Sequence, residues 1–287
     1  MDEKEVNINE LHDFKGNPYS VRDDEDMKML TESIKEFGII EPLLVRKRDE
    51  GGFEVISGHR RKYAGVKAGL EKVPVFIRNM DRDSAVIALV DSNLHRTNIL
   101  PSEKAFAYKM KLEAMKHQGR KINKTSEQLG QKLDNKSSVQ VLADEVGDSK
   151  SQVQRYIRLT ELIKPILDMV DENKMALSPA VEISYLSKEE QEDLFETMET
   201  EERTPSLSQA QKMKELSKQG ILDMDTIFDI MIEQKSNEKE IVKFEVDSIK
   251  KYFPKSYTIR QMVETIEQLL QDYQNKWKNR MKDRGAR

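Results

Sequence analysis

The chain has no cysteine, which excludes disulfide bonds, thiolate metal ligands and a cysteine nucleophile. Its four histidines include no pair at the HxxxH or HExxH spacing of zinc sites, so we expect no zinc centre. No apolar run approaches the roughly 18 to 20 residues that cross a membrane. The first ten residues, MDEKEVNINE, are acidic and lack an apolar stretch. We therefore expect no signal peptide, no membrane partner and a cytoplasmic location.

Aromatic residues are scarce as well, at 6% of the 287 residues, whereas charged residues reach 35%. This composition favours a helix-rich protein of two or three domains with modest hydrophobic cores. The net charge is −4 at pH 7. A protein that coats nucleic acid over its whole surface is usually basic, so any nucleic-acid site here is predicted to be a local basic patch.

The first 98 residues mix strand and helix patterns, which predicts an α+β domain over 1–98. A helix is expected over DEDMKMLTESIKEFG, because its apolar residues fall on one helical face and Gly38 can end it. The run LLV, the turn DEGG and the run FEVISG predict a β-hairpin over 43–57. A third strand, KVPVFIRNM, and a helix, RDSAVIALVDSNLHR, follow. The apolar face of the first helix consists of Met27, Leu30, Ile34 and Phe37.

From Pro101 onward the periodicity predicts an all-α region over 99–235. Its first helix is expected to end at Gly119, followed by a polar loop or a short helix over 119–138. The run SNEKE is the best linker candidate, and a small, mainly helical C-terminal module over 241–287 follows it. The apolar face of the last helix fits either a dimer interface or packing within the module. That face consists of Met262, Ile266, Leu269, Leu270 and Tyr273.

The segment VQVLADEVGDSKSQVQRYIRL, about 139–158, has the pattern of a helix-turn-helix. The small residue Ala143 stands where two helices must approach, Gly147 stands at the turn, and an apolar face returns at Val153. The second helix is expected to start after Ser149, which is a suitable N-cap. Its outward face would contact bases and phosphates in a major groove through Lys150, Ser151, Gln152, Gln154 and Arg155. The alternative is a plain helical hairpin with a solvated face.

The helix upstream of this motif is rich in basic residues that could track DNA phosphates. These residues are Lys104, Lys109, Lys111, Lys116, Arg120, Lys121 and Lys124. A charged helix face that simply meets water is the alternative interpretation.

The stretch ISGHRRKYAGVKAG stands at a strand-to-helix junction. Backbone N–H groups in the first turn of a helix are unpaired and favour an anion. Gly58 lets a ligand approach closely, and Arg60 or Arg61 can hold phosphate oxygens with a guanidinium fork. Cations at a helix N-terminus oppose the helix dipole, so the pair is unfavourable unless an anion binds. The alternative is two arginines that face water.

A second stretch, DSNLHRTNILPSEKA, also precedes a helix start. The side-chain oxygen of Asn93 suits a Mg²⁺ ion that is held together with phosphates, and Arg96 suits a phosphate. The alternative is a polar connector between domains.

These pieces, in this order, resemble the ParB family of partition proteins. IKEFGIIEPLLVR, then ISGHRRKYAGVKAG with VPVFI, then SNLHRTNILPSEKAFAY look like the three N-terminal boxes of that family, and the helix-turn-helix follows at the expected place. The resemblance covers roughly residues 5–220. It implies an N-terminal ParB-like domain that binds CTP, a central domain that recognises a palindromic double-stranded DNA site, and a C-terminal dimerisation domain. It further implies that CTP and Mg²⁺ close a homodimer into a sliding DNA clamp, with a ParA-type ATPase as a partner.

The resemblance also assigns roles by position. Nucleotide contacts fall on Gly38 and Ile39 at the base, on Gly58, His59, Arg60 and Arg61 in the phosphate loop, and on Arg96 at a further phosphate. Asn93 matches the asparagine that the family associates with the metal.

Three departures from the family pattern bear on the chemistry, and the first is Glu41, which stands where the first box usually has Gln. His59 stands where the phosphate loop usually has Glu. Ser92 stands where the family often has a Glu linked to hydrolysis, and Asp91 is the nearest candidate for that catalytic role. Adjacent residues on a helix point about 100° apart, so the sequence supports CTP binding better than slow CTP hydrolysis.

The sequence therefore predicts a nucleoid-associated partition protein of a plasmid, another mobile element or a chromosome. One alternative is a transcription or nucleoid-associated regulator of the same fold that lacks the nucleotide switch. An enzyme is the other, because sulfiredoxin-like and kinase-like proteins contain similar N-terminal domains. The absence of cysteine opposes redox chemistry, and the attached helix-turn-helix opposes a free-standing kinase.

Overall fold

The computed structural model describes residues 3–94, 96, 99–126, 137–233, 249–254 and 256–284. The chain forms two compact units, 1–233 and 234–287. The predicted SNEKE linker lies outside the described residues. Among the helices of the described parts, none is long and apolar enough to span a bilayer.

A mixed five-stranded sheet forms the N-terminal part of the first unit. Its strands are β1 (Glu3–Asn7), β2 (Leu11–His12), β3 (Leu43–Lys47), β4 (Phe53–Ser57) and β5 (Lys72–Ile77). They lie in the order β1-β5-β3-β4-β2. β3 pairs antiparallel with β4 and parallel with β5. The predicted hairpin over 43–57 and the predicted third strand are confirmed.

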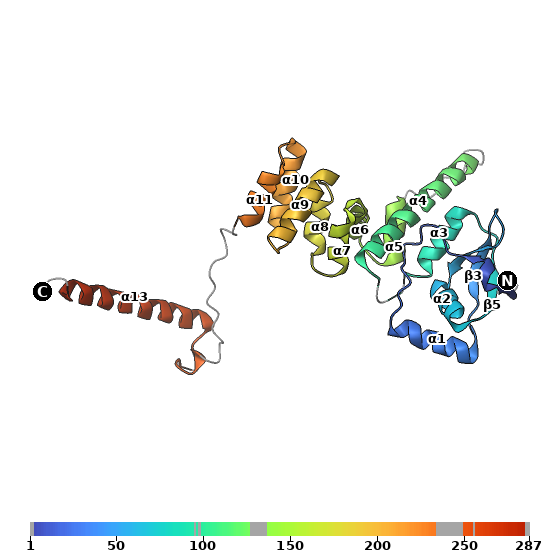
Figure 1. Cartoon of the computed structure of the whole chain (residues 1–287). Helices are drawn as coiled ribbons and strands as arrows, with labels where there is room; N and C mark the ends of the chain where they lie inside the picture. The colour runs from blue at the N-terminus through green and yellow to red at the C-terminus, as the bar shows by residue number, and fades with distance from the viewer. Residues whose placement is uncertain are drawn as a thin grey trace. The chain divides into compact units, whose positions relative to one another are not determined.

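Helices cover both faces of this sheet (Figure 1). α1 (Glu25–Phe37) and α2 (His59–Ala68) pack on the face that carries Val55, and α3 (Arg82–Asp91) packs on the face that carries Ile56. Successive strand residues point to opposite faces, so the buried run of β4 serves both cores. The predicted α+β architecture is confirmed.

α1 begins and ends as its sequence predicts, but its apolar face is shorter. The Asp24 carboxylate accepts from Met27 N–H at 2.9 Å, and Gly38 ends the helix at a φ of +69°. Phe37 was expected on the buried face, yet it is 63% exposed, whereas Ile34 is 3% exposed. Phe37 is the last residue of the helix, and the next apolar residue to enter the sheet core is Ile39.

The rest of the first unit is helical, as expected. Its helices are α4 (Pro101–Ser126), α5 (Ser138–Val146), α6 (Lys150–Arg158), α7 (Lys164–Asp171), α8 (Leu177–Ile183), α9 (Lys188–Thr200), α10 (Leu207–Gln219) and α11 (Met224–Ile232). The prediction that the first helix ends at Gly119 is wrong, because α4 continues to Ser126. An interior glycine costs a helix only about 1 kcal/mol, and the Lys, Arg and Gln neighbours of Gly119 are strong helix formers. Residues 127–136 of the expected polar segment lie outside the described residues.

α4 is the central helix of this unit. It packs against α3 of the sheet domain and against both α5 and α6. The small side chains Ala105, Ala107 and Ala114 are all buried, each in a different hydrophobic cluster. α4 is therefore shared between the sheet domain and the helices that follow.

The second unit contains α13 (Ile259–Arg284) and a short turn before it. Met262 is buried within the unit. Leu269, Leu270 and Tyr273 are each more than 60% exposed. Within this unit, packing therefore covers only the first part of the predicted apolar face.

The first prediction concerns two glycines that flank α2, both with positive φ. At Gly69 a Cβ would meet nothing within 4 Å, whereas at Gly58 it would lie 2.9 Å from Cγ of the buried Leu43. We expect Gly69→Ala to lower the free energy of unfolding by about 1 kcal/mol, the cost of left-handed backbone alone. Gly58→Ala adds a steric clash and should cost at least about 2 kcal/mol. Urea denaturation measures both, and equal losses would contradict the clash at Leu43.

Candidate nucleotide and DNA sites

The turn at Gly58 gives α2 an open N-terminus. Gly58 has a φ of +102°, no side chain caps the helix, and its first turn holds no acidic residue. The first-turn N–H groups therefore lack a side-chain acceptor, and they carry the positive end of the helix dipole. This geometry suits a bound anion.

A cavity of about 270 Å³ opens in front of this helix start. It brings together six of the predicted nucleotide residues, from two segments of the chain. They are Gly58, His59, Arg60, Arg61, Asn93 and Arg96. Among the described residues that line it, none is an Asp or Glu, so the lining favours an anionic ligand.

The two adjacent arginines have different partners. Arg61 Nη1 donates to the backbone oxygens of Glu41 and Pro42, the latter at 3.1 Å. It also lies 3.1 Å from the Glu41 carboxylate. Arg60 makes one loose ion pair, 3.5 Å from Asp24. The guanidinium of Arg60 is thus the more available for a phosphate, whereas Arg61 holds the loop between α1 and β3.

Asn93 and Arg96 form a second part of the lining. Arg96 Nη1 donates to Asn93 Oδ1 at 3.0 Å, and Asn93 Nδ2 donates to Leu89 O at 2.9 Å. Ser92 Oγ also donates to Leu89 O at 2.9 Å. The segment after α3 therefore contributes a neutral amide and a guanidinium, bonded to each other, to the cavity lining.

A segment that sequence reasoning missed also lines the cavity, and it includes Asn17, Tyr19, Ser20 and Val21. The buried carboxylate of Glu103, in the first turn of α4, accepts from the N–H of Ser20 at 3.0 Å and from its Oγ at 2.7 Å. Burial, and then the charge of Glu103, raise the pKa of Tyr19. No motif marks this segment, because its partner lies 83 residues further along the chain.

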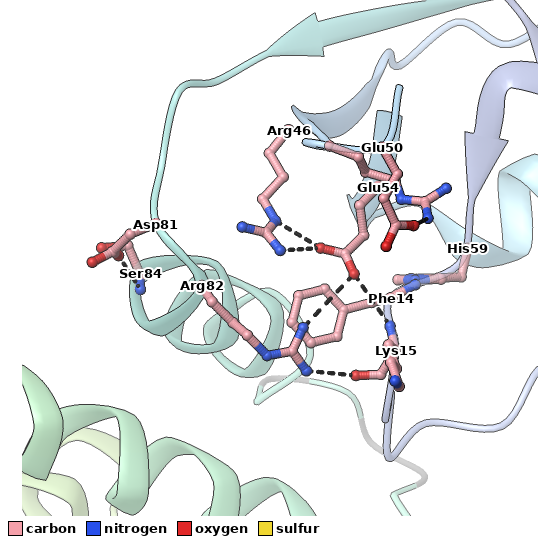
Figure 2. A network of polar contacts seen from close by, with 10 residues as sticks. Phe14, Lys15, Arg46, Glu50, Glu54, His59, Asp81, Arg82 and Ser84 are labelled. Atoms are coloured by element: carbon pink, nitrogen blue, oxygen red, sulfur yellow. Dashed lines mark hydrogen bonds and ion pairs between the residues drawn. The ribbon is translucent and has the colours of Figure 1, made fainter. Parts of the chain in front are cut away.

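His59 is held by a polar network centred on Glu54 (Figure 2). The Glu54 carboxylate is buried and lies 2.6 Å from both Nε and Nη2 of Arg46. It also accepts from Lys15 N–H at 3.3 Å, and the neighbouring Phe14 N–H donates to His59 Nε2 at 3.5 Å. Burial lowers the pKa of His59 below its ordinary value of 6.5, although the charge of Asp13 opposes the shift. The ring is therefore neutral near pH 7, with Nε2 as an acceptor.

Three other predicted residues lie outside the lining. Ile39 is buried beneath α2 in the sheet core, and Gly38 caps α1. Asp91 forms an ion pair with the buried Lys111. Ser92, rather than Asp91, lines the cavity.

The helix-turn-helix forms at the predicted residues. Gly147 has a φ of +71° at the turn, and Ser149 Oγ accepts from Gln152 N–H at 3.1 Å. Ala143 and Val153 are buried in one cluster with Leu142. The local geometry that the sequence predicted is confirmed, including the N-cap.

The predicted DNA-contacting face of α6 divides into two groups. Lys150, Ser151 and Gln154 are exposed, and Gln152 is partly so. Arg155 Nη2 donates to Ser178 Oγ of α8 at 2.6 Å. The guanidinium of Arg155 is therefore held to its own domain, and the other four residues offer the freer surface.

The expected basic face of α4 is largely an internal one. Lys111 is 2% exposed, so the prediction that it tracks phosphates is wrong. Lys104 lies 2.8 Å from Asp148 at the turn of the helix-turn-helix, and Lys109 lies 3.1 Å from Glu161. Lys116 is exposed, whereas the side chains of Arg120, Lys121 and Lys124 lie outside the description.

Comparison with known proteins agrees with this arrangement. The model of the ParB N-terminal domain matches residues 2–94, and that of the ParB HTH domain matches residues 98–219. A nucleoid occlusion protein of Bacillus cereus is 30% identical over 219 residues, which cover 73% of this chain and 68% of that protein. The chain belongs to the ParB family. A probable chromosome 1-partitioning protein ParB of Deinococcus radiodurans is 32% identical over 198 residues, which cover 69% of this chain and 60% of that relative's length.

A solved structure of ParB from Caulobacter crescentus, truncated at its C-terminus and complexed with CTP-γ-S, is also similar. It is 23% identical, with a TM-score of 0.32, and the match covers 65% of this chain and 94% of that one.

The second prediction uses His59, the first residue of α2. Its pKa is lower in the folded state, so the unfolded state binds the proton more tightly and folding stability falls as the pH drops below about 6.5. We expect the free energy of unfolding to fall more steeply in the wild type than in His59→Gln between about pH 7.5 and about pH 5. Urea titrations at several pH values give both slopes. Identical slopes would show that His59 titrates as it does in the unfolded chain.

Proposed function

We propose that the chain is a site-specific DNA-binding partition protein that binds CTP and Mg²⁺ in the cavity at Gly58. The observation that carries the proposal is the lining, which joins an uncapped helix start to Arg60 and Arg96 with no Asp or Glu among the described lining residues. The ParB match over both the N-terminal and helix-turn-helix regions supports the same function. The DNA site would be a short palindrome, read by α6 of two chains, and the nucleotide would close the dimer into a clamp.

The triphosphate fits the chemistry of the lining. The first-turn N–H groups of α2 would donate to one phosphate, Arg60 would pair with a second, and Arg96 would contribute a further guanidinium to the phosphates. Arg61 ties the loop of Glu41 and Pro42 to the same wall. Gly38 and Ile39, immediately before that loop, stay predictions for contacts to the cytosine base.

Mg²⁺ fits only together with the nucleotide. Asn93 Oδ1 is an oxygen ligand that Mg²⁺ accepts, but the described residues contain no group of three His, Asp or Glu that could hold a metal alone. Mg²⁺ commonly keeps its waters and binds through substrate phosphates with few protein oxygens. When bound, it would neutralise phosphate charge. We therefore expect Mg²⁺ binding to depend on CTP.

DNA contact is assigned to the exposed part of α6. Lys150 is placed for a phosphate, and Ser151, Gln152 and Gln154 for base edges, because the start of such a helix enters the major groove. The direct test is recovery of sheared genomic DNA by the tagged protein, with and without CTP, followed by sequencing. Enrichment of one site that spreads to flanking DNA only with CTP supports the proposal. Enrichment of a site that CTP leaves unchanged favours a regulator without the switch.

The third prediction separates the two ligands. Arg60→Ala removes a charge-assisted contact and should weaken CTP binding about tenfold or more, while recovery of the DNA site without CTP is unchanged. Gln154→Ala removes a base contact and should weaken site binding about fivefold or more, with CTP affinity unchanged. Equilibrium dialysis with labelled CTP and gel-shift titration measure the two affinities.

Arg48→Ala is the matched control, because it removes the same charge from the β3–β4 hairpin, where Arg48 pairs with Glu50. It should leave both affinities at the wild-type value. Equal loss of CTP and DNA binding in Arg60→Ala would assign that arginine to DNA instead.

The fourth prediction concerns self-association through α13. Leu269, Leu270 and Tyr273 form an exposed apolar face within the second unit, and a second copy of the chain would bury it as a homodimer. Leu270→Glu should shift the sedimentation of the protein from dimer towards monomer. Gln268→Glu adds the same charge at a polar neighbouring position and should stay dimeric. A Leu270→Glu variant that remains fully dimeric would exclude this face.

A further inference from the structure

Lys111 is the only lysine that the described residues bury. Its ammonium group contacts the carboxylate of Asp91, the last residue of α3, and lies 2.7 Å from the carboxylate of Glu145 in α5. Lys111 itself lies on α4. One charge therefore joins the end of α3 to the first helix of the helix-turn-helix.

The energetics of a buried ammonium make this junction a rigid one. A buried charge is costly unless it is paired, so Lys111 cannot easily leave its carboxylates. The side chains of Asp91 and Glu145 are 48% and 46% exposed, whereas that of Lys111 is 2% exposed. The position of the lysine is fixed by the packing around α4, and the two half-exposed carboxylates are held in place by their ion pairs with it.

Asp91 directly precedes two residues that line the cavity. Ser92 and Asn93 come next in the chain, and both bond back to Leu89 O of the last turn of α3. Arg96 Nη1 donates to Asn93 Oδ1. A phosphate in the cavity would compete with Asn93 for the Arg96 guanidinium, and so would change the bonds that hold this last turn.

The other end of the junction is connected to the DNA-contacting helix. Tyr108 O–H donates to Asp148 at 2.7 Å, and Lys104 lies 2.8 Å from the same carboxylate at the turn between α5 and α6. α4 thus holds α5 through Lys111 and the turn through Asp148. A displacement of α5 relative to α4 would therefore change the position of α6.

We propose that Lys111 is a positioning residue that transmits nucleotide occupancy from the cavity to the helix-turn-helix, through Asp91 on one side and Glu145 on the other. The proposal rests on the nucleotide site proposed above. Lys111 touches neither ligand, so its role is separate from binding either one. Nucleotide binding and the order of α5 are coupled only while both carboxylates are held.

Hydrogen exchange on the full chain tests this without knowledge of the DNA site. CTP with Mg²⁺ should slow amide exchange at 58–62, where it binds, and should change exchange across α5 (138–146) about fivefold or more, the low end of coupling between linked sites. Lys111→Met keeps the side-chain volume and should abolish the change at α5 while keeping the protection at 58–62. Glu145→Ala, at a half-exposed position, should do the same and serves if Lys111→Met folds poorly.

Two further variants separate a coupling role from a structural one. Lys111→Arg keeps the charge and should restore the response at α5. Lys109→Met removes a lysine from the same helix, where it pairs with Glu161, and should behave as wild type. An undiminished α5 response in both Lys111→Met and Glu145→Ala, or a wild type in which only 58–62 responds, overturns the proposal. A wild type with no CTP effect at 58–62 overturns the nucleotide site and the coupling with it.

Discussion

The one-residue turn at Gly58 is the constraint on which the candidate site depends. β4 must end and α2 must begin at the same point, with a left-handed backbone and with Leu43 Cγ only 2.9 Å from where a Cβ would lie. Any side chain there would displace Leu43 from the core. The turn therefore leaves the start of α2 uncapped, and the open N–H groups, with Arg60 beside them, become a place for negative charge. Gly58 thus avoids a clash with Leu43 in the core, and it also leaves the helix start open to an anion.

Support for this turn comes from a buried carboxylate on the preceding strand. Glu54 lies on the α3 side of the sheet with Ile56, where an unpaired charge would be costly. Arg46 neutralises the charge at one carboxylate oxygen, and the other oxygen accepts from Lys15 N–H (Figure 2). This second bond fixes the chain next to Phe14. Phe14 N–H in turn fixes the His59 ring. A single buried charge is thus satisfied by groups that also order one wall of the cavity, and that arrangement requires His59 to be neutral.

Local signals in the sequence predicted the local structure well, and distant partners explain what they missed. Asp24, Gly38, Gly147 and Ser149 act within four residues of their own positions, so the start and end of α1 and the helix-turn-helix could be predicted. The burial of Lys111 depends on residues 20 and 34 positions away, and periodicity alone made it look solvated. Ser20 and Glu103 meet across 83 residues. The grouping of the GHRR stretch with Asn93 and Arg96 was expected only from the resemblance, because the intervening strand and helix determine it.

Charge placement bears on how an acidic chain would hold the two proposed anionic ligands, a nucleotide and DNA. Three of the four α4 lysines whose side chains the structure describes form internal ion pairs, with Asp148, Glu161, Asp91 and Glu145 as their partners, so they would add little to a long-range attraction for DNA. With a net charge of −4, non-specific attachment, which depends on neutralising many phosphates, is weak. Under the proposed function, affinity would come from contacts that require a fitted ligand, at the exposed start of α6 and at the cavity lining, which has no Asp or Glu among its described residues. α4 contacts both places through paired charges, so the proposed coupling between them would pass through packed helices.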